Sequence, residues 1–107
     1  MTTTASRSRD HMRSRGYEAE CVEHRRGNRR FDLFGFADVI AYSEKSGIIL
    51  IQAYHKKDTK IHENMTPKRN KKIQKWISAG GVFQHHIWSF RQKNKRKFWK
   101  VNIIEFV

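Results

Sequence analysis

The chain has 107 residues, with 23 lysines and arginines against 10 acidic residues and a formal charge of +13 at pH 7. A chain of this length suits one small domain, and a second domain is not expected. Its single cysteine, Cys21, excludes an intrachain disulfide and a cysteine-based zinc site, and no apolar run approaches the roughly 20 residues that span a bilayer. We therefore expect a soluble, intracellular (cytoplasmic) protein whose partner is a polyanion, with nucleic acid favoured over a membrane surface.

The first part of the chain predicts a helix followed by a strand. Residues 1–5 have the composition of a flexible start, and the basic segment 5–15 predicts a helix that ends at Gly16. Residues 17–24, "YEAECVEH", alternate apolar and polar side chains with the period of a half-buried strand. The stretch "RRGNRR" that follows has the composition of a charged turn.

Two further strands are predicted on either side of the turn "SEKSG". Residues 33–42, "LFGFADVIAY", are rich in the aromatic and branched side chains that strands prefer. Residues 47–54, "GIILIQAY", form a nearly continuous apolar run, which is typical of a strand covered on both faces. Helices are therefore expected to pack against the sheet.

The last part of the chain predicts a helix and a hairpin. Thr66 can cap a helix whose first turn holds Pro67, and the glycines at 80 and 81 can end it. Segments 81–90 and 97–106 read as strands joined by a polar loop. The predicted class is α/β, with a mixed sheet of about five strands flanked by helices in the order helix, three strands, helix, two strands.

Asp38 and Gln52 are the main candidates for functional residues. Each is polar within an apolar run, a placement that costs free energy unless the polar atoms find partners. If the strands around them pair as a hairpin, Asp38 lies beside Gln52, and alternation places Tyr54 and Lys56 on the same face as Gln52. Carboxylate and amide oxygens suit Mg²⁺ or Mn²⁺, and a lysine can hold a phosphate.

A structural role remains open for each of these side chains. Asp38 can cap a turn or pair with an arginine, and Gln52 can bind the backbone of a covering helix. Lys56 can be the solvated end of a strand. Asp32, in "DLFG", has no role that the sequence predicts, and alternation turns His55 away from the expected site.

The order of elements and the stretches "FDLFGFADVIA", "GIILIQAY" and "WISAGG" followed by "IWSF" resemble the PD-(D/E)XK nuclease superfamily. The similarity is greatest to its short phage and bacterial members that are like Holliday-junction resolvases. It implies a restriction-endonuclease-like core, hydrolysis of DNA phosphodiesters with Mg²⁺ or Mn²⁺, a preference for branched or structured DNA, and a homodimer. It also implies that Asp38 and Gln52 bind the metal and act in catalysis.

The chain departs from the family pattern at two places. The family's lysine position is Tyr54 here, and Lys56, two residues further on, is the candidate for the catalytic lysine. The glutamate that resolvase-like members carry on their first helix has no convincing counterpart, since Asp10, Glu18 and Glu20 fit only loosely. These departures favour, as an alternative, a catalytically inactive module that keeps the nuclease fold and binds nucleic acid.

A third interpretation is a basic structural protein that binds RNA, although it would have no use for Asp38 and Gln52 on neighbouring strands. In every interpretation, basic clusters are expected to follow a phosphate backbone without reading bases. The predicted contacts are Arg29, Arg30, Lys57, Lys68, Arg69, Lys71, Lys72, Lys93 and Lys95.

Overall fold

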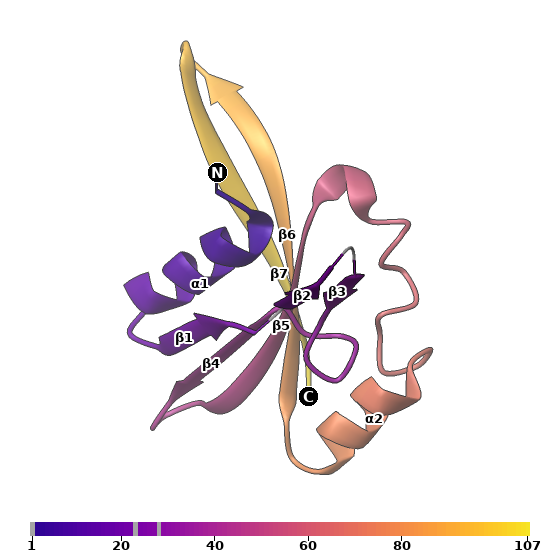
Figure 1. Ribbon diagram of the computed structural model, residues 1–107. Coiled ribbons are helices and arrows are strands. Elements are labelled where there is room, and N and C mark those ends of the chain that lie inside the picture. The colour runs from indigo at the N-terminus through magenta and orange to yellow at the C-terminus, as the bar shows by residue number, and fades with distance from the viewer. Residues whose placement is uncertain (1, 23, 28) are drawn as a thin grey trace.

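Five strands form a mixed sheet in the order β1-β4-β5-β6-β7 (Figure 1). The computed structural model describes residues 2–22, 24–27 and 29–107. The strands of this sheet are β1 (Glu18–Cys21), β4 (Val39–Ser43), β5 (Gly47–His55), β6 (Val82–Lys93) and β7 (Arg96–Phe106). β5 and β6 run parallel, and every other neighbouring pair is antiparallel.

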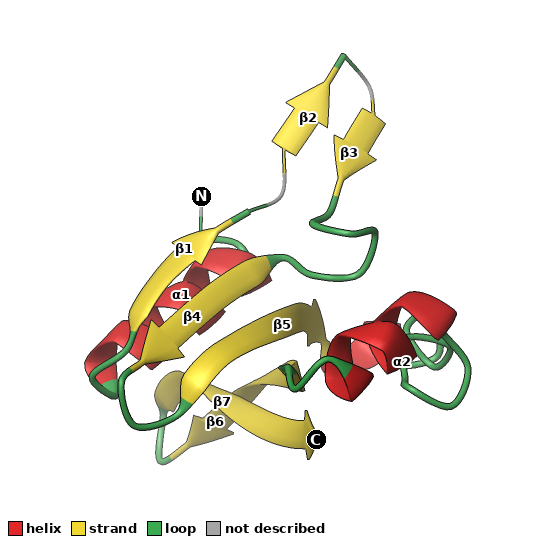
Figure 2. Ribbon diagram, turned by 90° about the horizontal axis from the view of Figure 1, so that it is seen from below, coloured by secondary structure: helices red, strands yellow, loops and turns green. Residues whose placement is uncertain are grey.

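The two α-helices, α1 (Thr4–Ser14) and α2 (Lys71–Ser78), pack on opposite faces of the sheet (Figures 1 and 2). Successive residues of β5 point to opposite faces, so Ile49 and Ile51 pack with α1 while Leu50 packs with α2. The α1 side also buries Ala5, Met12, Ala19, Val39 and Ala41, and the α2 side buries Phe36, Ala37, Ile73 and Phe83. The α/β class and the predicted order of helices and sheet strands are confirmed.

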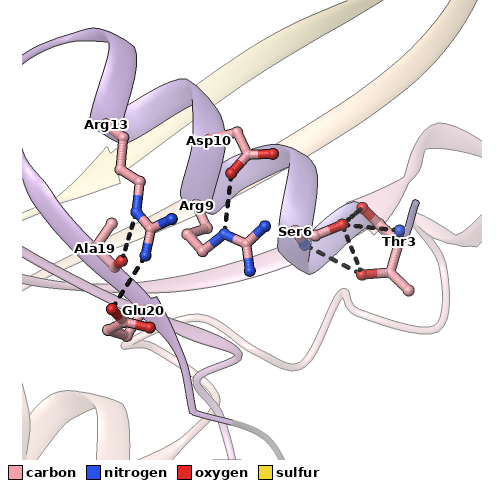
Figure 3. Close-up of polar contacts among 7 residues, drawn as sticks. All are labelled: Thr3, Ser6, Arg9, Asp10, Arg13, Ala19 and Glu20. Atoms are coloured by element: carbon pink, nitrogen blue, oxygen red, sulfur yellow. Dashed lines mark hydrogen bonds and ion pairs between the residues drawn. The ribbon is translucent and has the colours of Figure 1, made fainter. Parts of the chain in front are cut away.

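Helix α1 begins at Thr4, and Thr3 and Ser6 form a capping box at its start (Figure 3). Ala5 is buried, so Thr4 and Ala5 do not belong to a flexible segment as the sequence predicts. Ala5 packs in the core, which cannot be predicted from the composition of the first residues. At the other end, Arg13 donates to the carbonyl of Ala19 and to Glu20, which ties α1 to β1.

A small second sheet interrupts the predicted order. β2 (His24–Arg26) pairs with β3 (Arg29–Phe31) as a hairpin that projects from the main sheet (Figure 2). The sequence predicts a charged turn here and a first strand that reaches residue 24, whereas β1 ends at Cys21. The segment does contain a turn, as its composition predicts, but this turn joins the two strands of a separate hairpin.

The segment before β4 is a tight loop and not the start of a strand. Leu33 and Ala37 form an isolated bridge, and the backbone between them passes through positive φ at Phe34 and Gly35. β4 therefore begins at Val39, six residues later than the sequence predicts. Asp38 consequently lies at the point where the loop enters the strand.

Helix α2 starts at Lys71, and not at Pro67 as the sequence predicts. The Asn70 side chain accepts hydrogen bonds from the backbone N–H groups of Lys72 and Ile73, which makes Asn70 the N-cap. The preceding segment continues from β5 through the short 3₁₀-helix η1 (Lys56–Asp58) and a series of turns.

No helix among the described residues is long and apolar enough to cross a membrane.

β6 and β7 continue beyond the rest of the sheet as a two-stranded ribbon. β5 pairs with β6 only as far as Trp88, whereas β6 pairs with β7 as far as Lys93 and Arg96. We call residues 89–100 the arm, which projects past α1 in Figure 1. The predicted hairpin is confirmed, but its loop shrinks to Asn94 and Lys95, both at positive φ as a tight hairpin turn requires.

The α1 face also buries a chain of hydrogen bonds. Trp88 Nε1 donates to Ser8 Oγ (2.9 Å), and Ser8 Oγ in turn pairs with His86 Nδ1 (2.8 Å). His86 Nε2 pairs with Gln84 Oε1 (2.8 Å), and Gln84 Nε2 donates to Glu105 (2.9 Å). Because Gln84 offers its oxygen, His86 must donate from Nε2 and accept from Ser8 at Nδ1.

Candidate active site

A cavity of about 250 Å³ lies where β5 ends beside the loop before β4, and its lining includes Thr4 at the start of α1. We call it the acidic pocket. It is lined by Thr4, Asp32, Asp38, Gln52, Ala53, Tyr54, His55, Asp58 and His62. The sequence placed two of these residues, Asp38 and Gln52, in a candidate site.

Asp38 is held against β5 by both its backbone and its side chain. Its N–H donates to the carbonyl of Ile51 (2.8 Å), and its Oδ2 accepts from Gln52 Nε2 (3.1 Å) and from the N–H of Ala53 (2.9 Å). The carboxylate is only 2% exposed. The prediction that Asp38 and Gln52 lie side by side is confirmed, and the reason is the β4–β5 register, which pairs Val39 with Ile51.

Two acceptor oxygens in this pocket have no hydrogen-bond donor among the described residues. They are Asp32 Oδ1 and Gln52 Oε1, and both atoms are buried. Gln52 Nε2 donates to Asp38, the residue is 4% exposed, and Gln52 lines the pocket. A buried acceptor without a donor costs about 1–3 kcal/mol, and a cation is one way to satisfy it.

Asp32 reaches the pocket through the tight loop that follows it. Its carbonyl accepts from the N–H of Gly35, and Leu33 and Ala37 close the loop behind it. The sequence alone predicts no role for this aspartate. The available signal was the motif "DLFG", whose glycine at positive φ permits the turn that brings Asp32 back toward Asp38.

Tyr54, where the resemblance to the nuclease superfamily led us to expect a lysine, is buried and hydrogen-bonded. Its hydroxyl pairs with His85 Nδ1 (2.9 Å), and His85 Nε2 bonds the carbonyl of Met65. That carbonyl can only accept, so His85 donates from Nε2 and Tyr54 donates to Nδ1. Burial raises the pKa of Tyr54 and lowers that of His85, so both side chains are neutral near pH 7.

His62 is brought to the pocket by the segment between η1 and α2. Its ring stacks on Tyr54, with ring centroids 4.1 Å apart and planes 9° from parallel. The bond from His85 to Met65 fastens the same segment to the sheet. Nothing in the local sequence pattern around His62 identifies it, because its position depends on how this long segment folds back.

Lys56 does not line the acidic pocket. β5 ends at His55, and Lys56 begins η1, so the alternation that placed it beside Gln52 does not continue. Lys56 is exposed and borders a different hollow. His55 also lines the edge of the acidic pocket, although its ring contacts Trp99 (5.6 Å between ring centroids), on the side away from Gln52 that alternation predicts.

Most of the predicted nucleic-acid contacts are exposed on the surface. Lys68 and Arg69 lie in the turn before α2, and Lys71 and Lys72 lie in its first turn. Exposed residues also include Lys57 in η1 and Lys93 and Lys95 in the arm. The side chains of Arg29 and Arg30 lie outside the described residues.

The donor set fits a hard cation only in part. Aspartate and glutamine oxygens suit Mg²⁺ or Mn²⁺, and two of them are buried acceptors in need of a partner. Within the described ranges, however, no three His, Cys, Asp or Glu side chains lie close enough to form a complete metal centre. Such a site would hold the ion through Asp38, Gln52 and Asp32 together with water and substrate oxygens, as Mg²⁺ sites commonly do.

Comparisons of the chain with protein-family models, with curated proteins and with solved structures find no match.

Proposed function

We propose that this protein is a metal-dependent endonuclease that hydrolyses DNA phosphodiester bonds at the acidic pocket, on a restriction-endonuclease-like core of the PD-(D/E)XK type. The observation that carries the proposal is the pair of buried acceptors, Asp32 Oδ1 and Gln52 Oε1, beside the buried carboxylate of Asp38. Three further features support it: the order of helices and sheet strands along the chain, the charge of +13, and the location of the pocket at the end of β5.

Each residue has a distinct part in this function. Asp38, Gln52 and Asp32 would hold Mg²⁺ or Mn²⁺, which supplies charge neutralisation at the phosphate and activation of the attacking water. The N–H groups of Gln52 and Ala53 fix the Asp38 carboxylate in one orientation. The Tyr54 ring, held by His85, supports His62 at the wall of the pocket. Branched or structured DNA is the proposed substrate, and a homodimer is the proposed assembly.

An inactive module with the same fold is the second candidate function, and a specific observation favours it. The family's lysine is replaced by Tyr54, whose hydroxyl is already committed to His85. Lys56, the proposed substitute, borders another hollow. In that case the acidic pocket has lost turnover, and the basic surface binds nucleic acid.

Cleavage of labelled DNA separates these candidates. Wild-type protein is incubated with linear duplex, single-stranded and four-way-junction DNA in Mg²⁺, in Mn²⁺ and in EDTA, beside Asp38→Ala and Gln52→Ala. Removing a metal ligand should cost several kcal/mol of transition-state stabilisation, so we expect at least an approximately 100-fold slower reaction in Asp38→Ala. Asp10→Ala and Gln74→Ala are matched controls, because both residues are exposed and neither lines the pocket.

Three results are decisive. Metal-dependent products that disappear in Asp38→Ala and persist in Asp10→Ala establish the nuclease. Products that persist in Asp38→Ala contradict the proposed site. Binding of all three DNAs without cleavage by any variant identifies the inactive module.

A further inference from the structure

A second hollow, of about 420 Å³, lies where η1 meets the β6–β7 hairpin. We call it the basic groove. Three of its lining residues are cations, Lys56, Arg91 and Lys100, and three more can donate a hydrogen bond, Thr59, Ser89 and Asn102. Among the residues that the structure describes, no carboxylate lines it.

The strand register places these residues on the α2 face. Lys100 lies directly opposite Ser89, and Asn102 lies opposite Ile87. Residues 87, 89 and 91 share a face with His85, which bonds Tyr54 and Met65 on the α2 side. Gln52 and Tyr54, which line the acidic pocket, lie on this same face of the sheet.

The cations of the groove have no ion-pair partner within the described ranges. The ion pairs found there, Arg9 with Asp10 and Arg13 with Glu20, both involve α1. Three positive side chains around one hollow repel each other, and a bound anion removes this repulsion. The lining combines positive charge with neutral donors, which is the chemistry that binds phosphate oxygens.

The arm extends the same positive surface away from the groove. Lys93 lies directly opposite Arg96 on the α2 face, a pairing of like charges that is destabilising across two strands. On the other face of the arm, Phe90 contacts Trp99 (5.3 Å between ring centroids) and Arg7 of α1 lies over Trp99 (4.0 Å). An isolated two-stranded ribbon is only marginally stable, so these contacts hold the arm in place and leave its cationic face open.

The groove adjoins the acidic pocket through η1. Asp58 lines the acidic pocket, whereas Lys56 and Thr59 line the basic groove. A nucleic-acid strand with one phosphate in the acidic pocket could therefore continue into the groove and along the arm. A row of cations of this kind matches a chain of phosphates better than it matches a single free anion.

We propose that Lys56, Arg91 and Lys100 bind the phosphodiester backbone of the nucleic acid that flanks the scissile bond, with Lys93 and Arg96 continuing the track along the arm. Lys56 is thus a backbone-binding residue and not the catalytic lysine. This inference rests on the proposed nucleic-acid substrate, but it needs no turnover. A two-stranded ribbon is also narrow enough to enter the major groove of a duplex.

The test is the salt dependence of binding. Affinity for a labelled duplex of about 20 base pairs is measured by fluorescence anisotropy in EDTA, between about 50 and 300 mM salt. Each of Lys56→Ala, Arg91→Ala and Lys100→Ala should reduce the slope of log affinity against log salt by about 0.9, and the triple variant by about 2.7. Each single variant should also weaken binding at least about threefold at the low-salt end.

Matched variants separate a contact from a general loss of charge. Lys45→Ala removes a lysine from the turn at the opposite end of β5 and should leave the slope unchanged. Lys100→Arg keeps the charge and should keep the slope. If the three groove variants leave the slope unchanged, or lower it no more than Lys45→Ala does, the proposal is wrong.

The same groove variants, measured together with cleavage by Asp38→Ala, test other ligands of the groove and the proposed function. If the groove variants reduce binding to phosphatidylglycerol vesicles while duplex slopes are unchanged, the groove serves a lipid headgroup and the proposal fails. If the duplex slopes fall as expected but Asp38→Ala still cuts DNA, the proposed active site fails and the basic groove stands. Reduced slopes together with a loss of cleavage in Asp38→Ala support both.

Discussion

Each face of the sheet buries polar side chains, but the two faces treat them differently. On the α1 face, Ser8, His86 and Gln84 form one chain in which each buried polar atom has a partner. On the α2 face, Gln52 keeps an acceptor without a donor among the described residues, and so does Asp32, which lines the acidic pocket with it. A satisfied network stabilises and orders a fold, whereas unsatisfied acceptors cost stability and are kept where something binds. The difference separates a structural polar cluster from a functional one.

The largest expected effect on stability comes from breaking the satisfied network. His86→Ala removes a fully buried ring and leaves Ser8 and Gln84 without their partner. We expect a loss of about 2–4 kcal/mol in the free energy of unfolding, from the cavity and from the unpaired groups together. Urea denaturation measures it, and duplex affinity in EDTA should not change in the fraction that remains folded.

The same histidine should make the protein sensitive to acid. Burial, with smaller effects from His11 and His85, lowers the pKa of His86 to about 3, compared with 6.5 in the unfolded chain. The other side chains around it, Ser8, Gln84 and Trp88, are uncharged. Below pH 6.5 the unfolded chain therefore binds a proton that the folded protein does not, and stability falls as the pH falls.

The expected slope from His86 is about 1.4 kcal/mol per pH unit between pH 6 and pH 3, or about 2 kcal/mol lost between pH 6.5 and pH 5. Above pH 6.5 this residue contributes no pH dependence. Urea unfolding at pH 7, 6 and 5 measures the slope. His86→Gln should be less stable at pH 7 but show a flatter profile, and an unchanged profile would contradict the buried neutral histidine.

A further prediction concerns Gln52 and its neighbour Asp38, whose stability should depend on metal. Gln52→Glu adds a carboxylate beside the buried Asp38. Without metal, repulsion between the two carboxylates should lower stability by about 1–2 kcal/mol, and Mn²⁺ should restore it by binding the folded state. Thermal melting with and without MnCl₂ measures both effects.

Two controls make this result specific. The double variant Asp38→Ala with Gln52→Glu should lose most of the Mn²⁺ response, because one ligand is missing. Gln74→Glu adds the same charge at an exposed site and should not melt differently with the metal. Equal stabilisation of Gln74→Glu and Gln52→Glu by Mn²⁺ would remove the distinction between the two faces.

The sequence predicts the elements with strong local patterns and fails where distant contacts decide. Alternation and apolar runs identified the strands of the sheet, and they placed Asp38 beside Gln52. The predicted start of α2 was wrong because the helix is capped at Asn70, which places the buried Ile73 one turn later, and Thr66 and Pro67 lie in the turn before it. Lys56 was misplaced because the end of β5 cannot be read from a run of polar residues.

The rest of the site depends on segments that fold back over the sheet. Asp32 is brought to the pocket by a loop with positive φ at Phe34, although phenylalanine is a residue type that favours strands. His62 arrives through the segment that His85 fastens at Met65. Neither position follows from a local pattern, so the sequence names these residues but does not show that they line one pocket.

The smallest expected effect concerns the hydrogen bond between Tyr54 and His85, which is a paired polar contact on the α2 face. Tyr54→Phe keeps the ring that stacks on His62 but removes the hydroxyl that His85 accepts from. We expect a loss of about 1 kcal/mol in stability, the typical value of one buried hydrogen bond. If Tyr54 acts only by supporting His62, metal-dependent cleavage should fall less than about threefold, whereas Tyr54→Ala, which removes the ring, should reduce it much further. Equal cleavage by these two variants, each corrected for its folded fraction, would show that the stack of Tyr54 on His62 does not contribute to the reaction.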